Sequence, residues 1–498
     1  MGSAQAGVPP DKGNGRNTVP QELPDERAIR RRAADAGQEH VFRFWGDLPE
    51  EGRRRLLAQL AEVDFEELAE LIDQHVTHRR PPELPPDLEP APFIPLPTTD
   101  AERSCRARMR QLGEELLAAG KAAPMVVAGG QGTRLGFEGP KGAFPIGPVS
   151  GLTLFEIFAE AIHAARRAYG ASIPWYIMTS RANDLATRDF LEAHNYFDLP
   201  RADVKCFMQG MMPAIDLEGK LILAARDQLA WSPDGHGGSI RALARTGMLA
   251  DMAARGIEHI SYFQVDNPLV PPLDPVFIGH HADAASDMSS KMARKREPKE
   301  RIGAFCLSGG RLHVIEYSDL PDALAEARNP DGRLCFEAGS IAIHILSRAF
   351  VERLSAGRRF ALPFHRAEKK IPCIDDRGRP VNPARPNGIK FETFVFDALP
   401  MAENPVVLEI DRAVEFSPVK NAGGEDSPAT AQRDMIRLAA AWLEEAGVQV
   451  PRQADGTPTF KVEISPLAAR CVEELRALVA RLNLRTVAAD LYLGPETE

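Results

Sequence analysis

The sequence predicts an α/β protein whose core is a doubly wound, mostly parallel β-sheet. Between residues 125 and 265, apolar runs of strand length alternate with amphipathic segments of helix length. A loop dense in glycine follows directly on the first of these apolar runs. The composition is ordinary for a globular protein, with 44% hydrophobic and 26% charged residues. At 498 residues the chain is long enough for more than one domain.

The N-terminal part of the chain is expected to be accessory to this core. Residues 1–29 are rich in Gly, Pro, Asn and charge, so we predict a disordered tail. Residues 30–100 are predicted to form a helical segment followed by a proline-rich connector, because Val41, Leu57 and Leu68 lie on apolar helix faces and prolines crowd 81–97. We interpret the apolar faces as packing surfaces.

Residues 101–398 are expected to form the central domain. Helices are predicted over 101–119, 153–168, 183–194 and 239–255, and strands over 125–128, 175–179, 204–208 and 260–265. From 287 to 317 the strands lie closer together around Gly309-Gly310, which predicts an antiparallel hairpin. We interpret the basic run from Lys291 to Arg301 as a solvated strand edge and loop.

Residues 399–498 are predicted to be a small α+β C-terminal domain. An amphipathic pattern predicts a helix over 429–445, and the pattern beyond it predicts a strand over 460–464 and a helix over 467–481.

Charge and cysteine usage argue against several classes of function. A net charge of −10 and a pI near 5.8 argue against a nucleic-acid partner, whose phosphates call for a basic face. The six cysteines include no C-x-x-C pair, so neither a zinc knuckle nor a redox motif is indicated. The N-terminus lacks the apolar core of a signal peptide. We expect a cytoplasmic monomer with no membrane partner.

The glycine loop at 129–142 combines backbone N–H groups with two cations. Its glycines at 129, 130, 132 and 136 let the chain turn close to a bound group, and successive N–H groups in such a turn form an anion cradle. Arg134 and Lys141 add positive charge, which together with the cradle suits a nucleoside triphosphate. The dinucleotide fingerprint fails because Gly136 comes one place late, and the Walker loop fails because Gly142 follows Lys141.

Polar residues after later strands are candidates to complete such a site. Asp266 follows the strand at 260–265, where a carboxylate faces the ligand crevice of an open sheet and can hold a cation. Gln209 follows the strand at 204–208, and its amide can both donate to and accept from a pyrimidine edge. Gly235 and His236 lie in a second tight glycine loop before a helix. From spacing alone, a cap, turn or exposed-loop role stays open for these residues.

Together these motifs resemble the UDP-sugar pyrophosphorylases, most closely the UDP-N-acetylglucosamine pyrophosphorylase branch. The resemblance covers about 38–467 and rests on Gly129-Gly-Gln-Gly-Thr-Arg-Leu-Gly136, Pro140-Lys-Gly142, Gln209-Gly-Met-Met-Pro213, Val265-Asp-Asn267, Asn387-Gly-Ile-Lys390 and Phe416-Ser-Pro-Val-Lys-Asn421. It implies a GT-A-like nucleotidyltransferase core. The implied reaction is transfer of a uridylyl group from UTP to a sugar 1-phosphate, with release of pyrophosphate.

The resemblance also implies three kinds of role for individual residues. The implied catalytic residues are Arg134, Lys141 and Lys420. Those implied to bind the nucleotide are Ala128, Gly129, Gly130, Gln209, Gly235, Asp266 and Lys390. Those implied to bind the sugar are His236, Glu316, Tyr317 and Ser340. Asp266 would also hold Mg²⁺, the implied cofactor.

Two departures from the branch pattern concern the sugar. Ser340 stands in Ala338-Gly-Ser-Ile341 where the N-acetylglucosamine branch has Ala-Gly-Asn-Ile, and His236 stands where that branch has an asparagine. His236 is more like the glucose and broad-specificity branches. We predict N-acetylglucosamine 1-phosphate as the substrate. The alternatives are a UDP-glucose or broad-specificity UDP-sugar pyrophosphorylase and, from a different class, a non-catalytic regulator that binds sugar nucleotides.

Overall fold

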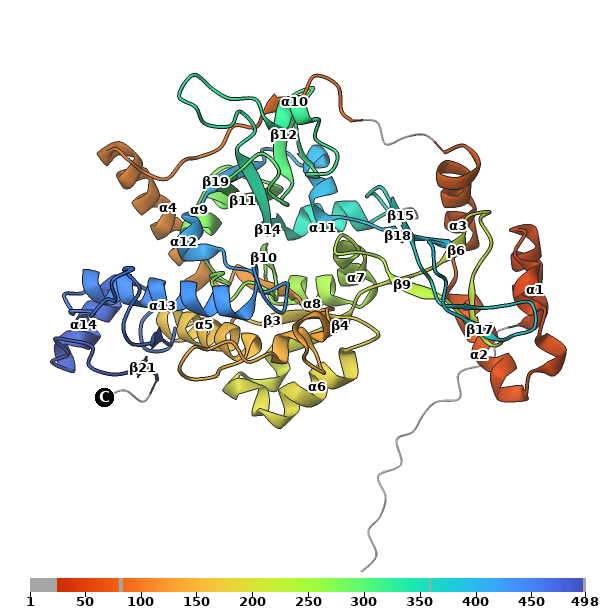
Figure 1. Cartoon of the computed structure of the whole chain (residues 1–498), viewed down its shortest axis with the longest axis horizontal. Coiled ribbons are helices and arrows are strands. Elements are labelled where there is room, and N and C mark those ends of the chain that lie inside the picture. The colour runs from red at the N-terminus through yellow and green to blue at the C-terminus, as the bar shows by residue number, and fades with distance from the viewer. Residues whose placement is uncertain (1–24, 80–83, 358–359, 496–498) are drawn as a thin grey trace, which may run out of the picture. The chain divides into compact units, whose positions relative to one another are not determined.

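The computed structural model describes residues 25–79, 84–357 and 360–495 (Figure 1). By its internal contacts the chain divides into two compact units. The smaller unit takes in the N-terminal residues up to 79 together with 213–231 and 368–390, and the larger unit takes in the remainder of the chain.

The smaller unit is discontinuous in sequence, which the sequence pattern did not predict. Its helices are α1 (Glu26–Asp35), α2 (Glu50–Glu62) and α3 (Phe65–Ile72). Its short strands include β6 (Ile215–Asp216), β7 (Leu223–Ala225), β8 (Gln228–Leu229), β16 (Cys373–Ile374), β17 (Pro380–Val381) and β18 (Gly388–Glu392). The segments 213–231 and 368–390 had been assigned to the central domain.

Buried hydrogen bonds from one side chain to backbone groups explain why a distant segment joins the N-terminal helices. The Gln38 side chain is 2% exposed; its Nε2 donates to Gly219 O at 2.9 Å and its Oε1 accepts from Leu221 N at 2.8 Å. These bonds satisfy buried peptide groups across more than 180 residues of chain. Residues 1–24 of the predicted tail lie outside the described residues. The last residues of the predicted tail, 26–29, are not disordered but form the start of α1, which Asp25 caps by accepting from Arg27 N.

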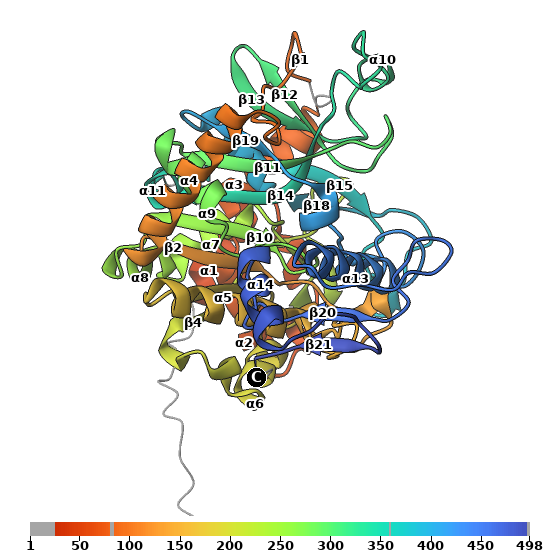
Figure 2. The same ribbon diagram turned by 90° about the vertical axis from the view of Figure 1, so that its left-hand side faces the viewer.

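The larger unit is built on a ten-stranded sheet within the described residues, and this confirms the mixed α/β class. Neighbouring strands of the sheet follow the order β1, β12, β14, β10, β2, β3, β4 (Figures 1 and 2). Three further strands pair beside this series: β11 with β14 and β19, and β13 with β12. Strands β10, β2, β3 and β4 are parallel, whereas β14 pairs antiparallel with both β10 and β11. The strands are β1 (Glu89–Pro90), β2 (Ala122–Val127), β3 (Trp175–Thr179), β4 (Val204–Met208), β10 (His259–Gln264), β11 (Met288–Arg294), β12 (Ala304–Ser308), β13 (Arg311–Ile315), β14 (Ala338–Ser347) and β19 (Val406–Glu409).

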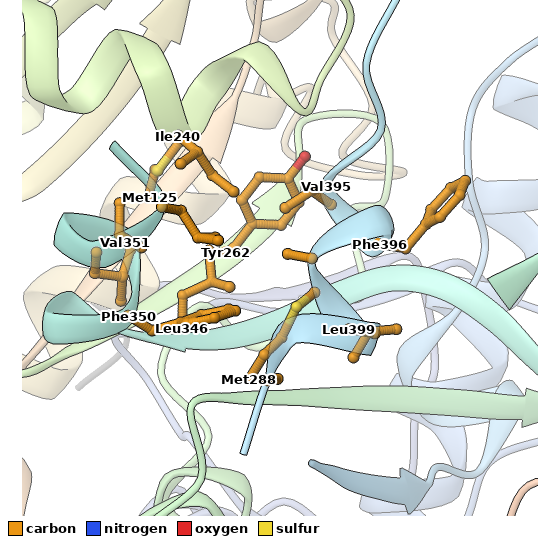
Figure 3. Close-up of a cluster of buried hydrophobic side chains, with 14 of the residues drawn as sticks. Met125, Ile240, Tyr262, Met288, Leu346, Phe350, Val351, Val395, Phe396 and Leu399 are labelled. Atoms are coloured by element: carbon orange, nitrogen blue, oxygen red, sulfur yellow. The ribbon is translucent and has the colours of Figure 1, made fainter. Parts of the chain in front are cut away.

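Apolar clusters join helices to the sheet of the larger unit. In one of them, Met125 of β2 and Tyr262 of β10 pack with Ile240 of α7 and Phe350 of α11 (Figure 3). A second cluster joins α5 and α9 to apolar residues of β2, β3 and β10. The principal helices are α4 (Asp100–Ala118), α5 (Leu154–Tyr169), α6 (Asp184–Ala193), α7 (Gly238–Arg245), α8 (Met248–Ala254), α9 (Pro275–Asp283) and α11 (Arg348–Ser355).

Two predictions within this unit need correction. The single helix predicted over 239–255 is two helices, because Gly247 between them adopts a left-handed φ of 76° that a continuing helix does not allow. The basic run from Lys291 is not solvated throughout. Lys291 is only 1% exposed, because β11 lies inside the sheet between β14 and β19. The predicted hairpin is confirmed as β12 and β13.

The C-terminal part of the larger unit has an apolar cluster of its own. It contains α13 (Pro428–Glu445), β20 (Val462–Ile464), α14 (Val472–Arg481) and β21 (Leu491–Leu493), coloured blue in Figures 1 and 2. Strand β21, which was not predicted, pairs in parallel with β20. Among the helices of the described residues, none combines the length and the apolar character needed to cross a bilayer.

Candidate functional site

The parallel strands of the larger unit bring the predicted loops to one edge of the sheet. Val127 at the end of β2 is in register with Gln264 at the end of β10, and Val265 N donates to Val127 O at 3.1 Å. Gly129 and Asp266 therefore leave neighbouring strands on the same edge, two residues beyond this pair. The carboxyl edge of parallel strands is where open α/β sheets bind ligands.

The backbone of the glycine loop is tied down through its carbonyl groups. Asn183 Nδ2 donates to Ala128 O at 2.8 Å and to Gly130 O at 3.0 Å, and Ser180 Oγ donates to Gly129 O at 2.7 Å. In a planar trans peptide the N–H points opposite to the C=O, so these bonds turn the following N–H groups away from the protein. An anion cradle needs N–H groups that are free in this way, and the role of the loop as a cradle stays a prediction. Sequence reasoning missed Ser180 and Asn183, since Asn183 was seen only as the start of a helix.

Gln209 adjoins this loop closely. It follows β4, and its backbone N donates to Thr179 O at 2.9 Å. A Cβ atom on Gly129 would lie 2.6 Å from Gln209 Oε1, a distance that permits only glycine at this position unless the amide moves. The two predicted nucleotide-binding residues therefore lie side by side. A base held by Gln209 would sit directly against the glycine loop.

One of the predicted cations, Lys141, pairs with Asp266. Lys141 Nζ lies 3.6 Å from Asp266 Oδ2, and the two side chains are only 15% and 12% exposed. Burial lowers the pKa of Lys141, the charge of Asp266 opposes this shift, and the positive charges of Lys420 and Arg134 lower the pKa further. Lys141, which pairs with Asp266, is thus also close enough to feel the charges of Arg134 in the same loop and of Lys420 in a distant segment. Such a concentration of positive charge in an acidic protein is suited to a polyanion.

A cavity of about 170 Å³ opens beside Asp266. Five residues predicted from the sequence line it, namely Asp266, Lys420, His236, Glu316 and Ser340. Its lining also includes residues that were not predicted, among them Asn267, Arg301, Gly303, Phe396, Phe416 and Pro418. Asn267 and the segment 416–420 belong to motifs quoted from the sequence, but nothing in their spacing predicted that they line the same cavity.

His236 presents a hydrogen-bond donor at this cavity. Its Nδ1 accepts from Val395 N at 3.3 Å and lies 3.3 Å from Tyr262 Oη. Burial, together with the charge of His365, lowers the pKa of His236 to about 4, so the ring is neutral at pH 7. A neutral ring whose Nδ1 accepts carries its proton on Nε2. The side chain can therefore donate to a hydroxyl or carbonyl oxygen.

Glu316 and Ser340 form another part of the cavity lining. Ser340 lies on β14, and its backbone N donates to Gly303 O at 2.7 Å. Glu316 follows β13, and burial and the charge of Asp319 raise its pKa. Tyr317, which was predicted to pair with Glu316 in sugar binding, is 45% exposed and lies outside the cavity lining. Its role in sugar binding stays a prediction.

The roles of two other predicted residues also stay predictions. Gly235 has a φ of 83°, and a Cβ atom there would lie 2.4 Å from Thr393 O, so packing alone accounts for glycine at this position. Lys390 lies half-buried on β18, in the smaller unit.

The donor set at Asp266 fits a magnesium ion shared with phosphates. In the described part of the chain, no cluster of three or more His, Cys, Asp or Glu side chains could hold a metal ion by itself. Mg²⁺ is commonly held by one or two carboxylates, several waters and substrate phosphates. A single carboxylate, Asp266, at the same sheet edge as the glycine loop fits that requirement.

A family model, relatives in sequence and solved structures all match this chain. The family model described as UTP–glucose-1-phosphate uridylyltransferase matches residues 100–439. A human protein named UDP-N-acetylhexosamine pyrophosphorylase-like protein 1 is 38% identical over 480 residues, or 91% of this chain and 94% of its own. The UDP-N-acetylglucosamine pyrophosphorylase of Saccharomyces cerevisiae is 36% identical over 445 residues, covering 84% of this chain and 91% of its own. The crystal structure of the uridine diphosphate N-acetylglucosamine pyrophosphorylase from Trypanosoma brucei superposes with a TM-score of 0.79 at 27% identity, covering 95% of this chain and 98% of that one.

Proposed function

The chain belongs to the UTP–glucose-1-phosphate uridylyltransferase family, and from this premise we propose that its sugar substrate is N-acetylglucosamine 1-phosphate. It is a UTP:sugar-1-phosphate uridylyltransferase, which forms a UDP-sugar and pyrophosphate. The observation that supports the assignment of its site is the pairing of Lys141 with Asp266, with the charges of Arg134 and Lys420 acting on Lys141.

The reaction is an in-line displacement at phosphorus. A phosphate oxygen of the sugar 1-phosphate forms a bond to the α-phosphorus of UTP, while the bond from that phosphorus to the bridging oxygen breaks and pyrophosphate leaves. Arg134 and Lys141 neutralise the charge that grows on the leaving pyrophosphate, and Lys420 orients the attacking phosphate. Catalysis then depends on position and charge, without a covalent nucleophile on the protein.

Asp266 would hold the magnesium ion of this reaction. When bound, the ion would offset negative charge on the UTP phosphates. The chain's own part is to present the Asp266 carboxylate at the end of β10 and to keep Lys141 close to it. Gln209, beside the glycine loop, is then available to hydrogen-bond the uracil.

The choice of N-acetylglucosamine 1-phosphate is supported by the names of the relatives. The yeast and Trypanosoma brucei proteins are both named for N-acetylglucosamine. The cavity favours a second candidate, a UDP-glucose or broad-specificity enzyme, because Ser340 supplies a hydroxyl in the place where the N-acetylglucosamine branch has an amide. A hydroxyl donates and accepts through a single oxygen, whereas an amide offers two N–H donors and a separate carbonyl acceptor.

A panel of sugar 1-phosphates tests this assignment. Glucose, galactose, N-acetylglucosamine and N-acetylgalactosamine 1-phosphates are each assayed with UTP and magnesium for pyrophosphate release. We expect the largest kcat/KM with N-acetylglucosamine 1-phosphate. A higher value with glucose 1-phosphate would favour the second candidate. A non-catalytic regulator would show a thermal shift with UTP and no pyrophosphate with any sugar.

Ser340→Asn is expected to sharpen the preference for the N-acetylated sugar. The amide can bond an acetamido group from both its donor and its acceptor, so the ratio of kcat/KM for the N-acetylglucosamine and glucose substrates should rise about tenfold. The measurement is the same panel. Ser318→Asn, at an exposed serine outside the cavity lining, is the matched control. An unchanged ratio in Ser340→Asn would remove this position from sugar selection.

A further inference from the structure

A buried ion-pair cluster lies next to the site and has no part in the reaction described above. Lys291 on β11 is 1% exposed; its Nζ lies 2.6 Å from Asp274 Oδ2 and also contacts Glu415 Oε2. Burial disfavours the charged ammonium, but the two carboxylates outweigh burial and raise the pKa of Lys291. The cluster therefore links three parts of the chain through one buried ammonium.

One carboxylate of this cluster leads directly to the cavity. Glu415 is the last residue of α12 (Arg412–Glu415) and immediately precedes the segment Phe416–Lys420. Phe416, Pro418 and Lys420 of this segment all line the cavity. The ion pair with Lys291 therefore fixes the end from which the Phe416–Lys420 segment starts.

Hydrogen bonds to backbone groups of the segment extend this restraint along it. Asn267 Nδ2 donates to Glu415 O at 2.7 Å, and Asn267 Oδ1 accepts from Ser417 N at 3.0 Å. Further along, Val419 N donates to Asp266 O at 2.8 Å. The segment is thus fastened at three points to the residues that follow β10, which include Asp266 itself.

The other carboxylate of the cluster, Asp274, belongs to the start of α9 and not to the cavity lining. Asp274 caps α9, where its Oδ1 accepts from Val276 N at 2.9 Å. Asp274 and Glu415 therefore share the same cation and similar burial, but only Glu415 is continuous with the Phe416–Lys420 segment. This difference allows the electrostatic and the positioning effects of the cluster to be separated.

We propose that Lys291, acting through Glu415, is a positioning residue that fixes the Phe416–Lys420 segment so that Lys420 meets the phosphate of the sugar substrate. This inference rests on the proposed function, which gives Lys420 that partner. The Lys420 side chain is 40% exposed, and its Nζ lies 3.8 Å from Asp426 Oδ2, so side-chain packing restrains it little. Its direction then depends on the backbone that carries it. A catalytic group that is free to move loses the rate advantage of a fixed geometry.

Glu415→Gln and Asp274→Asn test the proposal as a matched pair. Each variant keeps the size of the side chain and leaves Lys291 one carboxylate. In Glu415→Gln we expect kcat/KM for the sugar 1-phosphate to fall on the order of tenfold or more, while KM for UTP stays at the wild-type value. In Asp274→Asn we expect a similar loss of thermal stability and no change in kcat/KM for the sugar 1-phosphate. Equal effects of the two variants on this kcat/KM would overturn the proposal.

Hydrogen exchange tests the positioning without relying on turnover. In the ligand-free protein, peptides covering 416–421 should exchange faster in Glu415→Gln than in either Asp274→Asn or the wild type. Unchanged exchange in this segment would overturn the proposal even if the enzyme is active as described. A wild type that releases no pyrophosphate with any sugar would contradict the proposed function, and the exchange result would still decide whether Lys291 holds the segment.

Discussion

Replacing Arg134 by alanine is expected to lower kcat by about a hundredfold or more, which corresponds to a loss of about 3 kcal/mol of transition-state stabilisation. Arg134 lies in the glycine loop, and its charge acts on Lys141 beside Asp266. In the proposed reaction, negative charge grows on the pyrophosphate as it leaves, so a cation at this place acts most strongly in the transition state. The effect should therefore appear in kcat more than in KM for UTP.

Steady-state pyrophosphate release at saturating UTP and sugar 1-phosphate measures this effect. Arg108→Ala, which removes an exposed arginine from α4, is the matched control for the loss of one positive charge. We expect the control to keep the wild-type kcat. Turnover of Arg134→Ala at the wild-type rate would remove Arg134 from the catalytic step, and a rise in KM alone would restrict it to ground-state binding of UTP.

Asp266→Asn is expected to lower kcat by a comparable factor, on the order of a hundredfold or more. The substitution preserves the shape of the side chain but removes the carboxylate that would hold magnesium. It also removes the negative charge nearest to Lys141, so the cations around the loop lose the group that balances them. Restoring turnover should require a higher magnesium concentration than in the wild type.

The measurement is kcat as a function of magnesium concentration in the wild type and in Asp266→Asn. Asp283→Asn, at an exposed residue on the end of α9, controls for the loss of one carboxylate. A variant Asp266→Asn with wild-type turnover and wild-type magnesium dependence would show that the metal is held elsewhere.

The strands and the residues that follow them could be predicted from the sequence because local patterns determine them. The run at 175–179 is the fully buried β3, and the carboxylate predicted to follow the strand at 260–265 does follow β10. Because β2 and β10 are parallel and in register, the glycine loop and Asp266 lie at the same edge of the sheet. Five of the cavity residues were predicted from the sequence, but Ser340 and Lys420 among them only through the resemblance to a known family.

Long-range contacts could not be predicted, because no local pattern encodes them. Lys291 looked like part of a solvated basic run, yet it is buried with carboxylates that lie 17 residues before it and 124 residues after it. Gln38 likewise joins backbone groups about 180 residues away. In each case a polar side chain is buried because distant partners satisfy it, and a single sequence does not reveal those partners.

One site of this chain is expected to transfer the uridylyl group of UTP to a sugar 1-phosphate. Phosphorus NMR of the wild-type protein with UTP, magnesium and N-acetylglucosamine 1-phosphate follows both products in a single sample. We expect pyrophosphate and UDP-N-acetylglucosamine to appear in equal amounts as UTP disappears. Binding of UTP without either product, or pyrophosphate without a matching UDP-sugar, would contradict the claim.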